Sequence, residues 1–518
     1  MHALDVVVVV VYMMALVAIG LRTARRQTTT SRYFVAERSI PGWAAGMSLL
    51  ATIITSVTFI AYPGAAYAGD WNLLVPGIMF VVVVALIGRI VIPFFRHAVS
   101  MSVYEYFGQR FGTPVRMYAS FTFALGHFSK MGFVFYLLAL SVNGITGWPI
   151  GAIVLILGLL TVFYTLIGGL EAVIWTDVLQ GFVLWSGIAV TICILLFASP
   201  VPASQMIGVI VAHHKTSLGS MHFSLSAPTF WTLCIYGLFF YLQKYTADQT
   251  VVQRYLAART DKEALKGIGM GAWLCLPAWT AFMLIGSLLW AFYKLTGEAL
   301  PASITKPDQV FPHFMVTHMP IGLAGLFLAA LFGAAMSMLA SDLNCLAVII
   351  TEDFYAQFYP RHTDHQKLSV GKISIGICGL LAIAVSLQLA TTKGSALALY
   401  YTITAIVAGG LAGLFLLAFL NRRAGRRAAM VGIVVNLIFT VWATLTMNGG
   451  HIVNLHQFNY PWHEYSIGAI GNLLLLASGF LASWFIPVEA DAGGHTLWTW
   501  LVAERESRKF HSPMGGNQ

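Results

Sequence analysis

Residues 164–180 read YTLIGGLEAVIWTDVLQ, and this stretch joins two long apolar segments. The first segment ends near Gly168 and Gly169, and the second contains Asp177 close to its beginning and stays apolar to Pro200. An aspartate within a membrane helix is costly unless it faces protein, water or an ion. The stretch therefore predicts two successive membrane helices and makes Asp177 a candidate functional residue. The alternative is a carboxylate that forms a salt bridge near the cytoplasmic face.

The composition is that of a polytopic membrane protein. Of 518 residues, 58% are hydrophobic and 9% are charged, and the mean hydropathy is +0.78. A soluble domain needs far more charge to cover its surface. Apolar segments long enough to cross about 30 Å of hydrocarbon predict an all-α membrane protein with about 13 transmembrane helices, at residues 4–21, 40–68, 72–95, 117–142, 150–167, 173–198, 229–243, 267–293, 320–350, 369–388, 397–420, 428–447 and 464–486.

The basic residues predict the orientation. Most of the 29 Lys and Arg residues lie between alternate spans, in segments 22–38, 89–116, 244–266, 361–372, 422–427 and 505–509, whereas the opposite side holds Lys215, Lys294, Lys306 and Lys393. Basic loops stay in the cytoplasm, so we expect the amino terminus outside and the carboxyl terminus in the cytoplasm. The expected location is the inner membrane of the cell. Because the charges are spread over many short loops, the expected partner is the lipid bilayer and not a nucleic acid.

Two spans carry interruptions. The span at 40–68 contains several hydroxyl residues and then Pro63 and Gly64, which we expect to break the helix. The span at 229–243 is short and runs into the polar segment 243–249. Interrupted helices at corresponding positions of two halves indicate a midplane binding site in an inverted-repeat transporter. The predicted organisation is a first helix and linker (1–39), two five-helix repeats (40–198 and 229–420) separated by an extracellular loop (199–228), two accessory helices (421–486) and a cytoplasmic tail (487–518).

Four short motifs occur in order along the chain: RSIPGW at 38–43, GGLEAVIWTD at 168–177, TADQTVVQRYL at 246–256 and SDLN at 341–344. In these motifs the chain resembles the sodium:solute symporter family, and its pattern is most similar to that of the bacterial sialic-acid symporters. The resemblance implies the leucine-transporter fold, a 5+5 inverted repeat with one extra helix in front and two behind. It also implies import of a small organic solute, driven by a sodium gradient, through alternating access.

Small and hydroxyl-bearing residues recur at helical spacing in the second and ninth spans: Ala51, Ile54, Thr55 and Thr58, and Ala334, Ser337 and Ser341. The first set is expected on one face of a helix. The resemblance implies a main sodium site made by the carbonyl groups of Ala51, Ile54 and Ala334 with the hydroxyl of Ser337. It implies a second site made by Asp177, Ser337 and Ser341. The alternative is that these residues merely allow close packing of helices.

Three residues near the expected sodium sites depart from the family pattern. Met338 and Ala340 stand where hydroxyl groups are expected, and a thioether is a soft, poor ligand for sodium. Asp342 adds a carboxylate that could share a proton with Asp177, because two acids in one cavity raise each other's affinity for protons. Sodium is thus the first choice of coupling ion and a proton the alternative. Asp342 could also simply pair with a Lys or Arg.

Lys130 is the one basic residue predicted inside a span, where an unpaired ammonium is unfavourable. The matching residue of the sialic-acid symporters is an arginine that binds the substrate carboxylate, so the resemblance implies a carboxylate or an acidic sugar as substrate. Thr55 and Thr58 match hydroxyl contacts of that subgroup, and Tyr241 and Gln243 beside the second interruption are further candidates. An ion pair between Lys130 and a nearby acid is the alternative.

The sequence contains no nucleophile motif, phosphate-binding loop or metal-ligand spacing, so we expect neither an enzyme nor an organic cofactor, nor any metal beyond sodium. A membrane sensor that has kept the transporter scaffold without transporting is the second class of function considered. The sequence sets neither the identity of the solute nor the oligomeric state.

Overall fold

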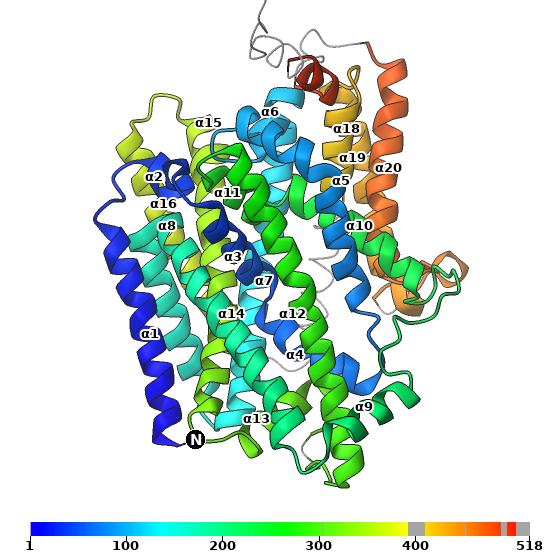
Figure 1. Cartoon of the computed structure of the whole chain (residues 1–518). Coiled ribbons are helices and arrows are strands. Elements are labelled where there is room, and N and C mark those ends of the chain that lie inside the picture. Colours follow the sequence, from blue (N-terminus) through cyan, green and yellow to red (C-terminus); the bar gives the residue numbers. More distant parts are fainter. Residues whose placement is uncertain (1, 303, 392–409, 451, 488–494, 504–518) are drawn as a thin grey trace, which may run out of the picture.

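The computed structural model describes residues 2–302, 304–391, 410–450, 452–487 and 495–503, and every regular element in these ranges is a helix (Figure 1). The long elements are α1 (Ala3–Ala24), α3 (Gly42–Ile53), α4 (Ser56–Ala68), α5 (Leu74–Ala98), α7 (Thr113–Thr146), α8 (Ile150–Cys193), α10 (Phe230–Thr246), α12 (Asp261–Thr296), α14 (Leu323–Val348), α16 (Asp364–Thr391), α18 (Leu411–Leu420), α19 (Arg426–Gly450) and α20 (Tyr465–Phe485).

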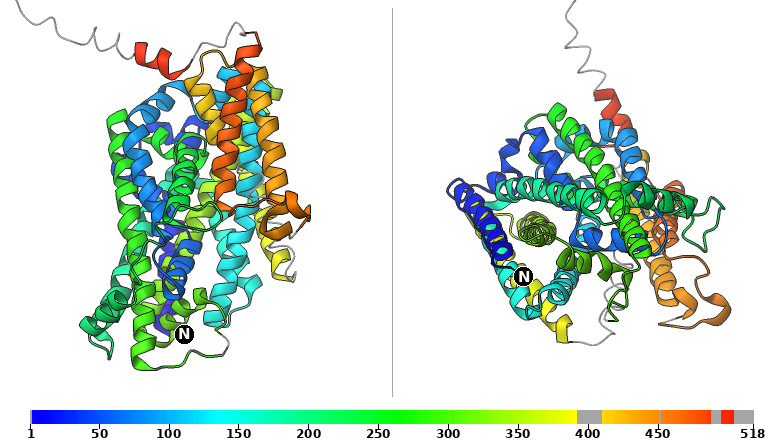
Figure 2. Two further views of the ribbon diagram at one scale, coloured as in Figure 1. Left: turned by 90° about the vertical axis from the view of Figure 1, so that its right-hand side faces the viewer. Right: turned by 60° about the horizontal axis from the view of Figure 1, so that its bottom comes forward.

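Short helices occupy the connections between these elements. They are α2 (Thr30–Val35), η1 (Ala36–Arg38), α6 (Tyr104–Phe111), η2 (Ile194–Ala198), α9 (Ala203–Ala212), α11 (Gln249–Ala257), η3 (Pro307–Gln309), α13 (Val310–Thr317), η4 (Ile349–Tyr355), α15 (Ala356–Phe358) and η5 (His456–Phe458). Figures 1 and 2 show α18, α19 and α20 side by side, on the side of the molecule opposite α1.

Nine of the described helices are long and apolar enough to cross a membrane, and α3 with α4 adds a tenth as one bent span. The prediction of thirteen differs at three places. Two predicted spans, 150–167 and 173–198, lie in the continuous element α8 and η2, and α10 has only 17 residues. Residues 397–409 of the predicted span 397–420 lie outside the described residues. The number thirteen stays a prediction.

The element formed by α8 and η2 is bent at a glycine. Its 49 residues would be about 74 Å long if straight, more than twice the hydrocarbon thickness, so it is long enough for the two predicted spans. Gly169 separates them with φ 56° and ψ −156°, a conformation that is essentially restricted to glycine. A Cβ atom on Gly169 would lie 2.7 Å from the carbonyl oxygen of Tyr33 on α2. Nearby, Glu171 pairs with Arg32 at 3.4 Å.

The first interruption lies earlier than we expected from the sequence. α3 ends at Ile53 and α4 begins at Ser56, with a 60° bend between them, whereas Pro63 lies inside α4. The expectation that Pro63 and Gly64 break the helix was therefore wrong. Proline is tolerated in a membrane helix when a neighbouring helix packs closely against it, and Gly286 of α12 contacts the backbone of Pro63.

The second interruption is where the polar segment predicted it. α10 ends at Thr246 and α11 begins at Gln249. Asp248 lies between the two helices and caps α11, because its Oδ1 accepts a hydrogen bond from the backbone N–H of Thr250 at 2.9 Å. The carboxylate of Asp248 is thus fixed at the break.

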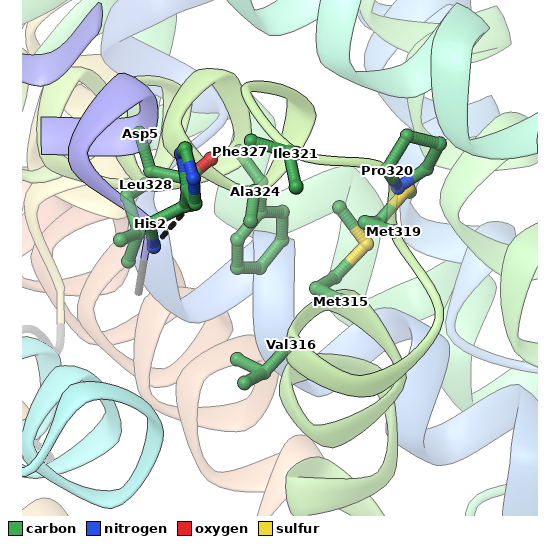
Figure 3. A pocket seen from close by; sticks show the side chains of 10 residues that line it. All are labelled: His2, Asp5, Met315, Val316, Met319, Pro320, Ile321, Ala324, Phe327 and Leu328. Carbon is green, nitrogen blue, oxygen red and sulfur yellow. Dashed lines mark hydrogen bonds between the residues drawn. The ribbon is translucent and has the colours of Figure 1, made fainter. Parts of the chain in front are cut away.

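α14 lies in the middle of the bundle, where it contacts α1, α3, α7 and α8 (Figure 1). Its most apolar window is 83% buried, the largest share among the nine spans of the described chain. Asp5 of α1 caps its beginning by accepting hydrogen bonds from the N–H groups of Gly322 (2.7 Å) and Gly325 (3.0 Å). Beside Asp5, a cavity of about 180 Å³ lies between α1, α13 and α14 (Figure 3).

The conformation of Gly169 gives a stability prediction. We expect Gly169→Ala to lower the melting temperature of the purified protein by several degrees. A side chain in this conformation costs about 1–3 kcal/mol, and the new methyl group would also meet the carbonyl of Tyr33. Gly144→Ala on α7 is the matched control, because an added Cβ there has nothing within 4 Å and alanine favours a helix. Equal melting temperatures for the two variants would contradict the role of Gly169.

Candidate functional site

The helices on either side of the first interruption, α3 and α4, both contact α14. Because α3 ends at Ile53, the carbonyl groups of its last turn have no partner within the helix. Ala51 and Ile54 are buried at this end, and Ala334 and Ser337 are buried on α14. The structure therefore brings together the two segments that were expected to hold sodium.

The two segments differ from the sequence-based expectation in one respect. Ala51, Ile54, Thr55 and Thr58 do not share one helical face, because Ile54 and Thr55 form the non-helical bend. Their spacing of three and four residues suggested a continuous helix, but the chain instead bends by 60° between Ile53 and Ser56. Thr55 caps α4, its hydroxyl accepting from the N–H of Thr58 at 3.5 Å.

Asp177 is fully buried on the second half of α8 and is surrounded by polar partners. Its carboxylate accepts hydrogen bonds from Ser48 of α3 (2.5 Å) and Ser337 of α14 (2.5 Å). The guanidinium of Arg254 on α11 lies 3.3 Å from the same carboxylate. The side chain thus faces protein and not lipid, and its pairing with Arg254 fits the alternative of a carboxylate in a salt bridge as well as a functional role.

Arg254 is the residue that the sequence analysis missed at this site. It is fully buried, donates from Nε to Ser48 (3.2 Å) and from Nη1 to the carbonyl of Thr250 (2.6 Å), and also donates to Ser341. Asp177, Ser337 and Ser341 of the expected second sodium site therefore do converge, but around a guanidinium group. Arg254 belongs to the motif at 246–256, and this position in the motif was the signal that could have identified it.

Lys130 and Asp342 form a second charged cluster. Nζ of Lys130 on α7 lies 2.9 Å from Oδ2 of Asp342 on α14. Nδ1 of His127, one turn earlier on α7, lies 2.7 Å from Oδ1 of Asp342. The Asp342 side chain is 1% exposed and that of Lys130 is 28% exposed, so the lysine is the partly exposed member of the pair.

This cluster extends to the break between α10 and α11. Nε2 of His127 lies 3.4 Å from Asp248, and Nζ of Lys244 lies 2.5 Å from the same carboxylate. Two lysines balance two aspartates, and the imidazole lies between the two pairs. Of this cluster, only Lys130 and Asp342 were expected from the sequence to have a role. The spacing of three residues from His127 to Lys130 places both on one helical face, which was an available signal.

The structure corrects the idea that Asp177 and Asp342 share a proton. Asp177 pairs with Arg254, and Asp342 pairs with Lys130 and His127. Each carboxylate therefore has its own cationic partner. The sequence left open that Lys130 pairs with an acid and that Asp342 pairs with a basic residue. Both alternatives are confirmed, because the two residues pair with each other.

The remaining candidates have different surroundings. The side chain of Met338 is buried in a small apolar cluster with Phe133 and Val134 of α7, which fits its departure from the hydroxyl pattern. The ring of Tyr241 packs on Phe80 of α5, with 4.6 Å between ring centroids. Tyr241 is therefore part of the aromatic packing, while Gln243 is half-buried near the end of α10.

The structure is a bundle of membrane helices in which two helices are interrupted. One interrupted helix meets the central helix next to a buried carboxylate and several hydroxyl groups. This is the architecture of a secondary active transporter. The family model described as the sodium:solute symporter family matches residues 33–436. The chain belongs to this family, as its motifs predicted.

Three comparisons describe its similarity to known proteins. The chain is 32% identical to the sodium/sialic acid symporter NanT of Aliivibrio fischeri, over 93% of each protein. It is 31% identical to the sodium/sialic acid symporter SiaT of Proteus mirabilis, over 92% of this chain and 94% of the relative. A solved structure of a Na⁺-coupled sialic acid symporter, substrate-bound and outward-open, is 30% identical with a TM-score of 0.85, covering 94% of this chain and 99% of the other.

These findings establish the general class of activity. The protein is a sodium-coupled symporter for a small solute, a multi-pass membrane protein with the leucine-transporter fold. The relatives are transporters and not enzymes.

The buried pair of Asp177 and Arg254 gives a prediction for a double-mutant cycle. Arg254→Gln and Asp177→Asn alone should each lower the unfolding free energy by about 3–5 kcal/mol, because each leaves one buried charge without a partner. The double variant should lose clearly less than the sum of the two. Thermal unfolding in choline buffer without sodium measures this, with the exposed Lys262→Gln as control. Additive losses would show that the two charges do not stabilise each other.

Proposed function

We propose that this symporter imports a solute that carries a carboxylate, an acidic sugar such as sialic acid or a smaller organic acid. Import takes place across the inner membrane, with the amino terminus outside and the carboxyl terminus in the cytoplasm. The observation that carries the proposal is the ion pair of Lys130 and Asp342 at the centre of the bundle. The similarity to two sialic acid symporters supports the same class of substrate.

The substrate carboxylate exchanges places with Asp342 on the ammonium of Lys130. Lys130 is the partly exposed member of the pair, so an incoming anion can reach it without unfolding the cluster. His127 already contacts Asp342 and keeps a partner on this carboxylate when Lys130 turns to the substrate. The exchange avoids leaving a buried charge unpaired at any step.

Lysine differs from the arginine of the sialic-acid symporters in what it selects. An ammonium binds a carboxylate as a point charge, whereas a guanidinium holds it in a planar, two-point geometry. We therefore expect a less strict orientation of the carboxylate. Thr55 and Thr58, which lie beside the bend, are proposed to bind hydroxyl groups of the solute, and Gln243 to line the opposite side.

Sodium binds where the bend of α3 and α4 meets α14. Its proposed ligands are the carbonyl groups of Ala51, Ile54 and Ala334 and the hydroxyl of Ser337. These are hard oxygen ligands at the end of an interrupted helix, the kind of site where transporters of this type bind Na⁺. The proposed second site at Asp177 and Ser341 has to share the carboxylate with Arg254, since the guanidinium already contacts both residues.

Alternating access links the two sites. Sodium bound at the bend holds the unwound backbone in place and so prepares the neighbouring substrate site. Once both are occupied, one group of helices moves against the other, and both ligands are released inside down the sodium gradient.

Proton coupling is the second candidate, and His127 is the observation that favours it. Its two ring nitrogens face the carboxylates of Asp342 and Asp248, so the imidazole connects the two acidic groups of the cluster. The proton site would then lie at this cluster and not between Asp177 and Asp342.

Substrate recognition is tested with Lys130. We expect Lys130→Gln to reduce sodium-driven uptake of N-acetylneuraminic acid or lactate into proteoliposomes by roughly 10- to 100-fold, the loss of one charge-assisted contact. Lys130→Arg should restore much of it because the charge is kept. Lys262→Gln, exposed on α12, controls for loss of surface charge. Unchanged uptake in Lys130→Gln would show that Lys130 does not bind the substrate carboxylate. Binding of the solute by the wild type without any uptake would favour a sensor.

The coupling ion is tested with Ser337. We expect Ser337→Ala to raise the sodium concentration that gives half-maximal uptake, because one oxygen ligand is lost. Uptake by the wild type should follow an imposed sodium gradient and stop when choline replaces sodium. Uptake that follows a pH gradient in choline buffer would instead select the proton-coupled mechanism.

A further inference from the structure

A groove between α5 and α12 lies outside the transport site. Its volume is about 340 Å³, and its lining includes Arg89 and Lys266 together with apolar and small residues. Trp273, which also lines the groove, is 65% exposed. Such exposed apolar side chains on a membrane helix face lipid, so the groove opens toward the bilayer.

The two basic residues lie at one end of the groove. α5 and α12 are antiparallel here, because Arg96 near the end of α5 pairs at 2.6 Å with Asp261 at the beginning of α12. Counted from this ion pair at 1.5 Å per residue, Arg89 and Lys266 lie about 10 Å and about 8 Å into the bundle. Trp273 lies about 18 Å in. The groove therefore has its basic residues toward the ion pair of Arg96 and Asp261 and its apolar end farther along the two helices.

Two of the residues that line the groove, Gly88 and Gly269, lack a side chain. Gly269 has nothing within 4 Å of an added Cβ, and an added Cβ on Gly88 would meet only Val84 and Ile92 of its own helix. Helix α12 therefore leaves a shallow space beside α5 that a slender apolar chain can occupy. An unbranched acyl chain has this shape.

Arg89 and Lys266 are both exposed and have no ion-pair partner among the residues that the structure describes. Two positive charges at the edge of an apolar groove repel each other and attract an anion. Basic pockets between membrane helices on the cytoplasmic side bind the headgroups of anionic lipids. A second copy of this chain fits poorly, because a two-fold contact would bring like charges together.

We propose that this groove binds one anionic phospholipid, with its phosphate between Arg89 and Lys266 and an acyl chain over Gly88 and Gly269. The lipid comes from the leaflet on the side of Arg96 and Asp261, which is the cytoplasmic leaflet in the proposed orientation. Only the choice of leaflet rests on the proposed function, and lipid binding itself is independent of the transported solute.

Native mass spectrometry of the detergent-purified protein tests the proposal. We expect one phosphatidylglycerol molecule to remain bound to the protein when phosphatidylcholine, added at the same lipid concentration, does not. Each of Arg89→Gln and Lys266→Gln should weaken phosphatidylglycerol binding about five-fold, and the double variant about twenty-five-fold. Gly269→Leu should block the groove and remove the bound lipid without removing a charge. Melting temperatures verify that each variant is folded.

Lys262→Gln is the matched control, since Lys262 is exposed on the same helix one turn earlier but does not line the groove. If Lys262→Gln weakens phosphatidylglycerol binding as much as Arg89→Gln or Lys266→Gln does, the lipid is held only by a general attraction to the basic surface. This result would overturn the proposal. Retention of the lipid in Gly269→Leu, displacement of it by inorganic phosphate, or a dimer that dissociates in the Arg89 and Lys266 variants would also overturn it. Solute uptake by the same variants tests the proposed function separately from the binding of lipid.

Discussion

The structure depends on a buried ion pair between Asp177 and Arg254. Two charges are tolerated away from water only when each is paired and its remaining hydrogen-bonding positions are filled. Ser48 and Ser337 bind the carboxylate, and Ser48 and Ser341 bind the guanidinium. These residues belong to α3, α8, α11 and α14, so one polar cluster holds together helices that are distant in the sequence. Both interrupted spans contribute to it.

The central helix α14 connects this cluster with the second one. Ser341 contacts Arg254, and the next residue, Asp342, contacts Lys130 and His127 of α7. Successive residues of a helix point about 100° apart, so the two clusters lie on different sides of the same rigid element. In the proposed mechanism, a change of partner at Lys130 acts on α14 and through this helix on the cluster of Asp177 and Arg254. This is the route by which we propose that the solute is coupled to sodium.

Several features of the site could be predicted from the sequence, and others could not. The polar segment 243–249 marked the second interruption correctly, because charged residues cannot continue an apolar span. The first interruption was assigned to Pro63, but the helix tolerates this proline because Gly286 of α12 packs against its backbone. Asp177 and Lys130 were identified since a charge in a span is rare. The partners Arg254 and His127 were not, because nothing along the chain specifies which charges meet.

The sequence by itself determined that this is a helical membrane protein of the sodium:solute symporter family, and it identified Asp177 and Lys130 as charges within spans. Length and hydropathy of a segment depend on neighbouring residues alone, and family motifs are read directly from the chain. Only the tertiary structure decided that Asp177 pairs with Arg254 and Lys130 with Asp342. The physical reason is that a buried charge is stabilised by whichever opposite charge lies within a few ångströms, and this distance is set by how whole helices pack.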